Sequence, residues 1–195
     1  MKKSGSINII CGPMFSGKTE ELLRTLHRLS YAKKDFLLFK LKMDNRYDEE
    51  KVVSHSKNAM MAINVENSLE ILKHCEKNPH IKYIGIDEVQ FLPQDDIFNA
   101  YKLLEELRKR GYTVFCSGLD MDYLGKPFGI MGSILAIADN VTKLKAVCFE
   151  CGDDAGMSAK INLDSEEIID IGSSEKYQSM CHDHWLKNLK KQESK

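Results

Sequence analysis

Residues 12–19 have the residue types and the spacing of a phosphate-binding loop. They read Gly-Pro-Met-Phe-Ser-Gly-Lys-Thr, which matches the pattern Gly-x-x-x-x-Gly-Lys-Ser/Thr. Glycines let the backbone approach phosphate oxygens, and a helix that starts here adds free N–H groups and partial positive charge. Lys18 would reach the terminal phosphates, and the Thr19 hydroxyl would hold magnesium. The candidate phosphate-binding residues are Gly12, Pro13, Met14, Phe15, Ser16, Gly17, Lys18 and Thr19.

An acidic pair follows a second apolar run. Residues 81–86 read Ile-Lys-Tyr-Ile-Gly-Ile and lead directly into Asp87 and Glu88. A carboxylate at the end of such a strand orients magnesium opposite a phosphate loop, and Asp87 is the candidate. Glu88 would point elsewhere and could take a proton from a substrate hydroxyl. Because many ATPases carry the same pair with the glutamate activating water, the pair alone fits a kinase and a hydrolase equally.

Three cysteines and a histidine form two pairs with metal-binding spacing. Cys148 and Cys151 enclose two residues, and Cys181 and His184 enclose two more. Zinc prefers four tetrahedral thiolate or imidazole ligands, and a two-residue gap lets one turn present two of them. Four protein ligands leave no open position, so we expect a structural zinc. His182 is an alternative to His184, with poorer spacing.

The elements that must position these residues alternate between strand and helix. The phosphate loop lies between a predicted strand and a predicted helix, as its chemistry requires. Alternating elements indicate an α/β class with a parallel sheet covered on both faces. Strands are predicted at 7–11, 35–40, 81–86, 112–116 and 141–146, and helices at 20–29, 67–76, 95–110 and 129–138.

Apolar positions on two of these helices predict the faces that they bury. Leu69, Ile71 and Leu72 share the apolar side of helix 67–76. The apolar face of helix 95–110 would carry Ile97, Tyr101, Leu104 and Leu107. Gly111 would end this helix, because glycine readily adopts the left-handed conformation of a C-cap.

The pattern changes at Cys148, which predicts a domain boundary. We expect a phosphate-binding and catalytic domain over 1–147 and a small zinc-binding domain over 148–186. The second domain would be built from short β pieces at 159–163 and 167–171. Residues 187–195 are mostly charged and are predicted to be a frayed tail.

Composition limits the location and the partners of the chain. The 195 residues are 43% hydrophobic and carry a net charge of −1, with no basic, aromatic-rich face, so no nucleic-acid partner is expected. A leader and a run of transmembrane length are not found, which predicts a cytoplasmic protein without a membrane partner. Six cysteines in that compartment favour metal ligands or free thiols over disulfides.

Taken in order, these pieces resemble the cellular-type (type II) thymidine kinases over nearly the whole chain. The matching segments are 12–19, 44–47, 84–91, 118–120, 126–129, the two Cys/His pairs and 176–177. The resemblance implies a RecA-like α/β core with a small zinc-bearing domain. It also implies transfer of phosphate from ATP to the 5′-hydroxyl of thymidine, with deoxyuridine as a second substrate. Members of this family are commonly homotetramers.

The resemblance also implies roles for single residues. Glu88 would be the catalytic base, Asp87 would assist magnesium with Thr19, and Arg46 would lie near the phosphates and sugar. A loop at about 168–177 would close over the base and bind it through backbone groups. The residues at the positions that bind the base are Met14, Phe91, Tyr123, Phe128, Ile168, Gly172 and Tyr177.

Two positions depart from the pattern of the family. Many members have threonine at the position of Asn45 and cysteine at the position of His184. Histidine is also a good zinc ligand, so the predicted metal site survives the second change. Two other functions stay open at this point: a nucleic-acid-dependent ATPase with a zinc ribbon, and a nucleotide-binding regulatory module without catalysis.

Overall fold

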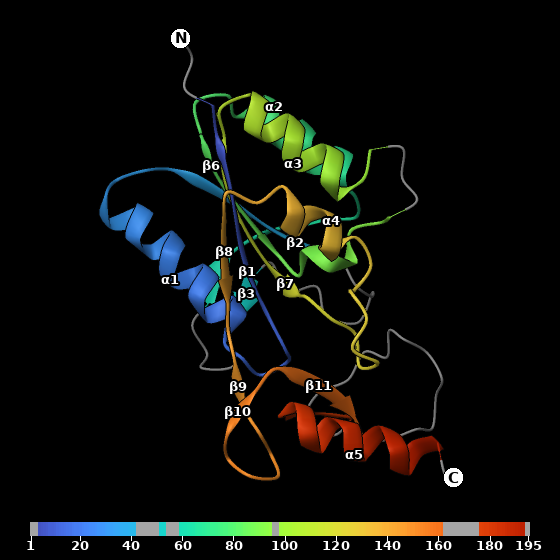
Figure 1. Ribbon diagram of the computed structural model, residues 1–195. Helices are drawn as coiled ribbons and strands as arrows, with labels where there is room; N and C mark the ends of the chain where they lie inside the picture. Colours follow the sequence, from blue (N-terminus) through green and yellow to red (C-terminus); the bar gives the residue numbers. More distant parts are fainter. Residues whose placement is uncertain (1–3, 42–50, 54–58, 95–97, 162–175, 194–195) are drawn as a thin grey trace.

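A six-stranded parallel sheet forms the centre of the molecule (Figure 1). The computed structural model describes residues 4–41, 51–53, 59–94, 98–161 and 176–193. The strand order is β5-β2-β6-β7-β1-β8, and all five pairings are parallel. Since the strands are parallel, their carboxyl ends lie at one edge. The strands are β1 (Ser6–Gly12), β2 (Phe36–Leu41), β5 (Ile63–Val65), β6 (Tyr83–Asp87), β7 (Thr113–Leu119) and β8 (Asn140–Lys143).

Helices cover both faces of this sheet, as Figure 1 shows. Helix α1 (Lys18–Tyr31) lies on one face, where Leu22, Leu23 and Leu26 pack against the sheet. The opposite face is covered by α2 (Ser68–Lys77), α3 (Ala100–Lys109) and α4 (Met131–Ala136). The predicted α/β class and the parallel sheet are therefore confirmed.

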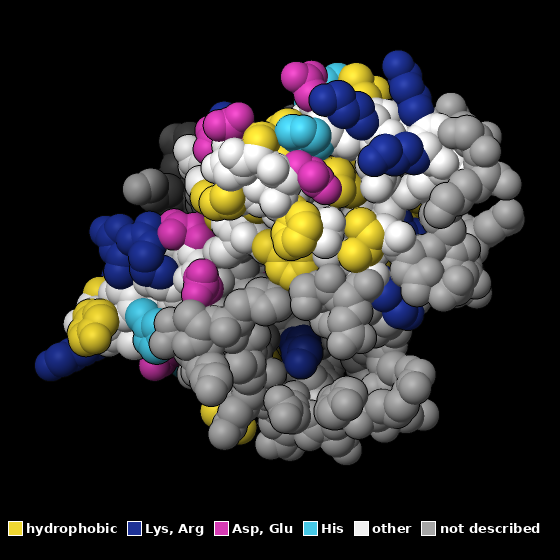
Figure 2. All heavy atoms as spheres, turned by 90° about the horizontal axis from the view of Figure 1, so that it is seen from below, with side chains coloured by type: hydrophobic (Ala, Val, Ile, Leu, Met, Phe, Trp, Pro, Cys, Tyr) yellow, Lys and Arg dark blue, Asp and Glu magenta, His cyan; other side chains and the backbone are white. Residues whose placement is uncertain are grey.

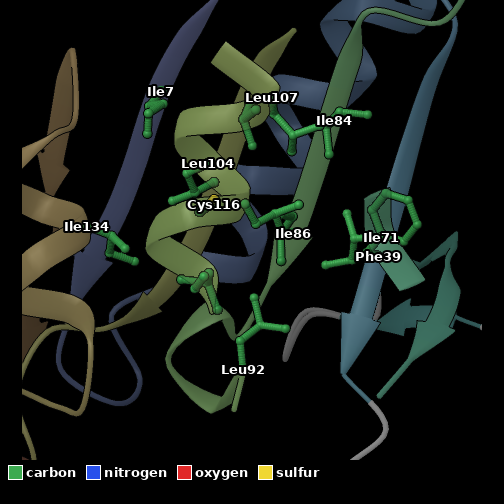
Figure 3. Close-up of a cluster of buried hydrophobic side chains, with 14 of the residues drawn as sticks. Ile7, Phe39, Ile71, Ile84, Ile86, Leu92, Leu104, Leu107, Cys116 and Ile134 are labelled. Carbon is green, nitrogen blue, oxygen red and sulfur yellow. The ribbon is translucent and has the colours of Figure 1, made fainter. Parts of the chain in front are cut away.

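Alternating side chains of the strands build a core on each face. In β1, Ile7 and Ile9 belong to the cluster under α3 and α4, whereas Ile10 belongs to the cluster under α1. Figure 3 shows the larger cluster, in which Ile84 and Ile86 of β6 lie close to Leu104 and Leu107 of α3. Burial on both faces explains why these strands are almost continuously apolar in sequence.

The chain beyond β8 forms a separate layer of short strands and one helix. We call the described residues from 146 to 161 and from 176 to 193 the C-terminal module. Its strands pair antiparallel, β9 (Ala146–Val147) with β10 (Asp154–Ala155) and β11 (Met157–Lys160) with β12 (Tyr177–Met180). Two further short strands, β3 (Lys51–Val53) and β4 (Ala59–Met61), pair elsewhere. The β piece predicted at 167–171 lies outside the described residues, and the division into domains stays a prediction.

The prediction of a frayed tail over residues 187–195 was wrong for most of that segment. Helix α5 (His182–Glu193) runs through most of the segment that we expected to fray. Its Trp185 and Leu189 pack into the apolar cluster of the C-terminal module. Gln192 donates a hydrogen bond to the carbonyl of Lys160 at 2.6 Å. These contacts stabilise a helix whose many charges made it look like a solvated tail.

Two predicted helix faces also need correction. Leu69 is 47% exposed and Tyr101 is 38% exposed, so neither belongs to the core. Helix α3 begins at Ala100, later than predicted, because the Asn99 side chain caps it by accepting a hydrogen bond from the amide of Lys102. Gly111 does end α3 with φ +81°, and its amide donates to the carbonyl of Arg108.

Substitutions in α2 test this assignment of faces. Ile71 is fully buried, so Ile71→Ala should lower the free energy of unfolding by about 2–5 kcal/mol. Leu69→Ala removes a similar side chain from the exposed side and should change it by less than about 0.5 kcal/mol. Urea denaturation of both variants measures the difference. An equal loss in the free energy of unfolding for both variants would show that Leu69 is buried as Ile71 is.

Candidate phosphate-binding site and metal centre

The phosphate loop turns sharply from β1 into α1. Gly12 has φ +144° and Gly17 has φ +79°, both in the range that favours glycine. A Cβ on Gly12 would lie 2.4 Å from the carbonyl oxygen of Leu144, so no larger residue fits. Lys18 Nζ donates to the carbonyl of Pro13 at 2.7 Å, which folds the loop around the lysine. The loop thus has the compact shape that cradles an anion.

Lys18 is largely buried from solvent. Its side chain is only 8% exposed. Burial lowers the pKa of Lys18, while the negative charges of Glu88 and Asp87 oppose this shift. An ammonium group that has lost most of its water interacts strongly with an anion. Phosphate oxygens bound by this loop would therefore interact strongly with Lys18.

Asp87 lies at the carboxyl end of β6, next to the start of α1. Thr19 Oγ1 donates to its carboxylate at 3.2 Å, and the Ser117 hydroxyl of β7 donates to Oδ1. Burial, followed by the charge of Glu88, raises the pKa of Asp87 to about 6, although both hydroxyls act in the opposite direction. The hydroxyl of Thr19 and this carboxylate are oxygen ligands of the kind that magnesium takes beside phosphate oxygens.

Glu88 is held in a conformation that non-glycine residues rarely adopt. Its φ is +55°, and such strain concentrates at functional sites. Glu88 Oε2 accepts a hydrogen bond from Gln90 Nε2 at 2.5 Å. The other end of the Gln90 side chain accepts the amide of Leu119 at 3.1 Å. Gln90 thus fixes the carboxylate of Glu88 against the end of β7.

The described aromatic candidates take part in separate contacts. Phe91 and Phe128 meet edge to face, with ring centroids 5.6 Å apart. Lys160 Nζ lies 5.4 Å from the centre of the Tyr123 ring, and Lys160 pairs with Tyr177 between β11 and β12. Arg46, Ile168 and Gly172 lie outside the described residues.

A hydrogen bond joins the phosphate loop to the C-terminal module. The amide of Met14 donates to Ser158 Oγ of β11 at 2.9 Å. Ser158 is buried, so this bond is shielded from water. The candidate base-binding residue Met14 therefore lies against the strand that also carries Lys160.

Cys148, Cys151, Cys181 and His184 form one cluster, which we call the Cys/His cluster. Their ligand atoms all lie within 4.8 Å of one another. Cys181 Sγ lies 3.9 Å from Cys151 Sγ and 3.2 Å from His184 Nδ1. Zn–S bonds of about 2.3 Å give tetrahedral edges of roughly 3.8 Å. The cluster therefore fits a zinc ion, with His184 as the histidine ligand.

Several residues that support these sites were not among the sequence candidates. Most are recognisable only when the fold brings distant segments together. Ser117 gave a weak signal as a hydroxyl directly after the apolar run 114–116, and Gln90 stands inside a segment that carries the resemblance. The additional residues are Ser117, Gln90, Ser158, Lys160 and Trp185.

Comparison with known protein families gives a match over most of the chain. The family model described as thymidine kinase matches residues 5–185. The match includes the phosphate loop, the acidic pair and the Cys/His cluster.

Among the described residues no helix has the length and apolar character needed to cross a membrane.

The pKa of Asp87 predicts a pH-dependent effect of Asp87→Asn. A carboxyl whose pKa is about 6 when folded, against roughly 3.9 when unfolded, stabilises the fold below pH 4. That contribution is lost as the pH rises through 6. Without nucleotide or added magnesium, Asp87→Asn should therefore be more stable than the parent at pH 8, by up to about 3 kcal/mol, and less so at pH 5. Chemical denaturation at both pH values measures this.

Asp35→Asn, at an exposed carboxylate, is the matched control for this experiment. A parent protein that is more stable than Asp87→Asn at pH 8 under these conditions would show that hydrogen bonds outweigh the burial of charge at this position.

The Cys/His cluster predicts about one zinc per chain, and two neighbouring histidines provide a matched test. His184→Ala should lose zinc, and amide protection should fall across the C-terminal module, because three ligands hold the metal less tightly. His182→Ala should keep it, because His182 is exposed and lies outside the cluster. Metal analysis of the purified proteins measures the contents. Zinc retained in His184→Ala but lost in His182→Ala would reverse the assignment.

Proposed function

This chain belongs to the thymidine kinase family, and we propose that it transfers the γ-phosphoryl group of ATP to the 5′-hydroxyl of thymidine. The observation that carries the proposal is the contact between the two ends of the site. Thr19 of the phosphate loop lies 3.2 Å from Asp87, and Glu88 follows directly in the chain. Donor phosphates on the loop would thus be next to a carboxylate that can take a proton.

The loop would hold the donor by charge and by backbone groups. Residues 12–19 would surround the phosphates, and the partly desolvated Lys18 would stabilise the charge on the transferring group. We propose that Arg46 lies near the same phosphates. Such positioning accounts for most of the catalysis in phosphoryl transfer, because little covalent chemistry is left to the protein.

Glu88 would act as the base in the transfer. As the 5′-oxygen of the nucleoside attacks the γ-phosphorus, the bond from phosphorus to the departing ADP oxygen breaks, and the hydroxyl proton passes to Glu88. Gln90 keeps the Glu88 carboxylate in one orientation through its 2.5 Å hydrogen bond. A fixed base removes the need to order a side chain during the reaction.

Two metals complete the proposal. Thr19 and Asp87 would hold magnesium, which when bound neutralises phosphate charge. Cys148, Cys151, Cys181 and His184 would hold a structural zinc, whose closed ligand set leaves no position for a substrate. The chemistry therefore stays with the residues of the phosphate loop and the acidic pair.

Aromatic and apolar side chains would bind the nucleobase. A thymine ring is flat and weakly polar, so Met14, Phe91, Tyr123, Phe128 and Tyr177 suit it. Ile168 and Gly172 are proposed to bind it through their backbone. A pocket of this kind would also accept deoxyuridine, which lacks only the methyl group. We further propose a cytoplasmic homotetramer.

The charge distribution gives little support to a nucleic-acid-dependent ATPase. Figure 2 shows the face that carries β10 and α5. Among its described residues, Lys and Arg side chains stand in separate groups with acidic and histidine side chains between them. A strand of nucleic acid favours a continuous basic track with stacking aromatics.

A product assay tests the proposed function. With magnesium and ATP, thymidine monophosphate should be the main product when thymidine is offered beside deoxycytidine, deoxyadenosine and deoxyguanosine. Glu88→Gln should reduce kcat by about 10²–10⁴ while ATP binding persists, because the amide keeps the shape but cannot take the proton. Chromatography of the products and calorimetry of ATP binding provide the readouts.

The opposite results are equally informative. Near-parental turnover of Glu88→Gln would remove Glu88 from the role of base. If folded, zinc-loaded protein gives no monophosphate but hydrolyses ATP faster with DNA or RNA, the kinase proposal is wrong and the ATPase is favoured.

A further inference from the structure

The indole of Trp185 joins the Cys/His cluster to a loop with two candidate base-binding residues. Trp185 is the only tryptophan of the chain and is 7% exposed. Its Nε1 donates to the carbonyl of Tyr123 at 2.9 Å. These residues are 62 positions apart in sequence, so the contact connects segments that chain connectivity does not hold together.

The loop on one side of this contact is a small closed unit, residues 120–128, which we call the 120–128 hairpin. Met121 and Pro127 pair across it, and the Asp122 carboxylate accepts the amides of Leu124 and Lys126, both at 2.9 Å. At its tip the indole lies so close to Gly125 that a Cβ there would be 2.9 Å from it. A displaced indole would therefore displace the whole tip.

On the other side, Trp185 is tied to the metal ligands. It follows His184 directly, and its amide donates to the carbonyl of Cys181 at 3.0 Å. Its side chain packs in one cluster with Cys148 and Met157. A metal bound by the Cys/His cluster would fix His184 and hence the first turn of α5. The backbone of Trp185 belongs to that turn, so the position of its indole would be fixed as well.

We propose that Trp185 is a positioning residue that couples the Cys/His cluster to the nucleoside site. Cys181 and His184 would hold the metal and so fix the first turn of α5; the indole holds the carbonyl of Tyr123, and the hairpin would present Tyr123 and Phe128 to the base. The inference rests on the proposed function for its substrate, but the mechanical link between the cluster and the hairpin does not depend on it.

Trp185→Phe is the direct test, because phenylalanine keeps an aromatic ring and loses the donor. In zinc-loaded protein the KM for thymidine should rise roughly five- to tenfold, the value of one buried hydrogen bond, while kcat stays within about twofold. Zinc content should not change. Amides of residues 124–126 should exchange with solvent faster than in the parent, which is a readout independent of catalysis.

A second pair of variants approaches the contact from the hairpin. Gly125→Ala and Gly111→Ala place alanine at similar φ values, +73° and +81°, so the backbone strain is matched. The Gly125 Cβ would meet Trp185, whereas Gly111 ends α3, outside the 120–128 hairpin and the Cys/His cluster. Gly125→Ala should therefore weaken thymidine binding and shift the Trp185 emission, and Gly111→Ala should do neither. This pair also decides the case if Trp185→Phe does not fold.

The outcomes separate the inference from the proposed function. If the parent binds thymidine in equilibrium dialysis, and Trp185→Phe and Gly125→Ala bind it equally well with unchanged exchange at 124–126, the positioning role is wrong. If the parent binds no thymidine, the proposed function fails, and faster exchange in the two variants would still support the link between cluster and hairpin.

Discussion

Buried charge at the carboxyl edge of the parallel sheet is the constraint on which the candidate site depends. Asp87 and Lys18 are both nearly inaccessible to water, and burial shifts the pKa of each toward its neutral form. Two hydroxyls, from Thr19 and Ser117, keep the carboxylate hydrogen-bonded. A site held in this way is costly when empty and would gain stability if phosphate and a cation bound to it.

The parallel topology is what allows such an arrangement. Since every strand of the main sheet points the same way, β1 delivers the phosphate loop and β6 delivers Asp87 to one edge. Strand β7 lies between them and contributes Ser117 and the amide of Leu119. Strand β7 carries neither motif, yet it contacts Asp87 through Ser117 and reaches Glu88 through Gln90.

Patterns confined to one segment could be predicted from the sequence, and contacts between segments could not. Apolar runs predicted five of the six strands of the main sheet and missed the short β5. The spacing of Cys148, Cys151, Cys181 and His184 predicted a cluster that the fold assembles. Helix α5 was missed because its buried side is narrow: Trp185 and Leu189 hold it against the C-terminal module, while charges cover the rest. The base-binding role of the aromatic residues stays a prediction. Ile168 and Gly172, which were assigned to the same site, lie outside the described residues.

The C-terminal module contacts the rest of the chain at the phosphate loop and at the 120–128 hairpin. Ser158 accepts an amide of the phosphate loop, and Trp185 donates to the 120–128 hairpin. Both bonds use backbone groups of the core, so their geometry depends on where the module lies and little on the identity of Met14 or Tyr123. A small metal-bound unit of short strands has too little core to hold its shape alone. Zinc in the Cys/His cluster would therefore act on the site through the position of two backbone groups.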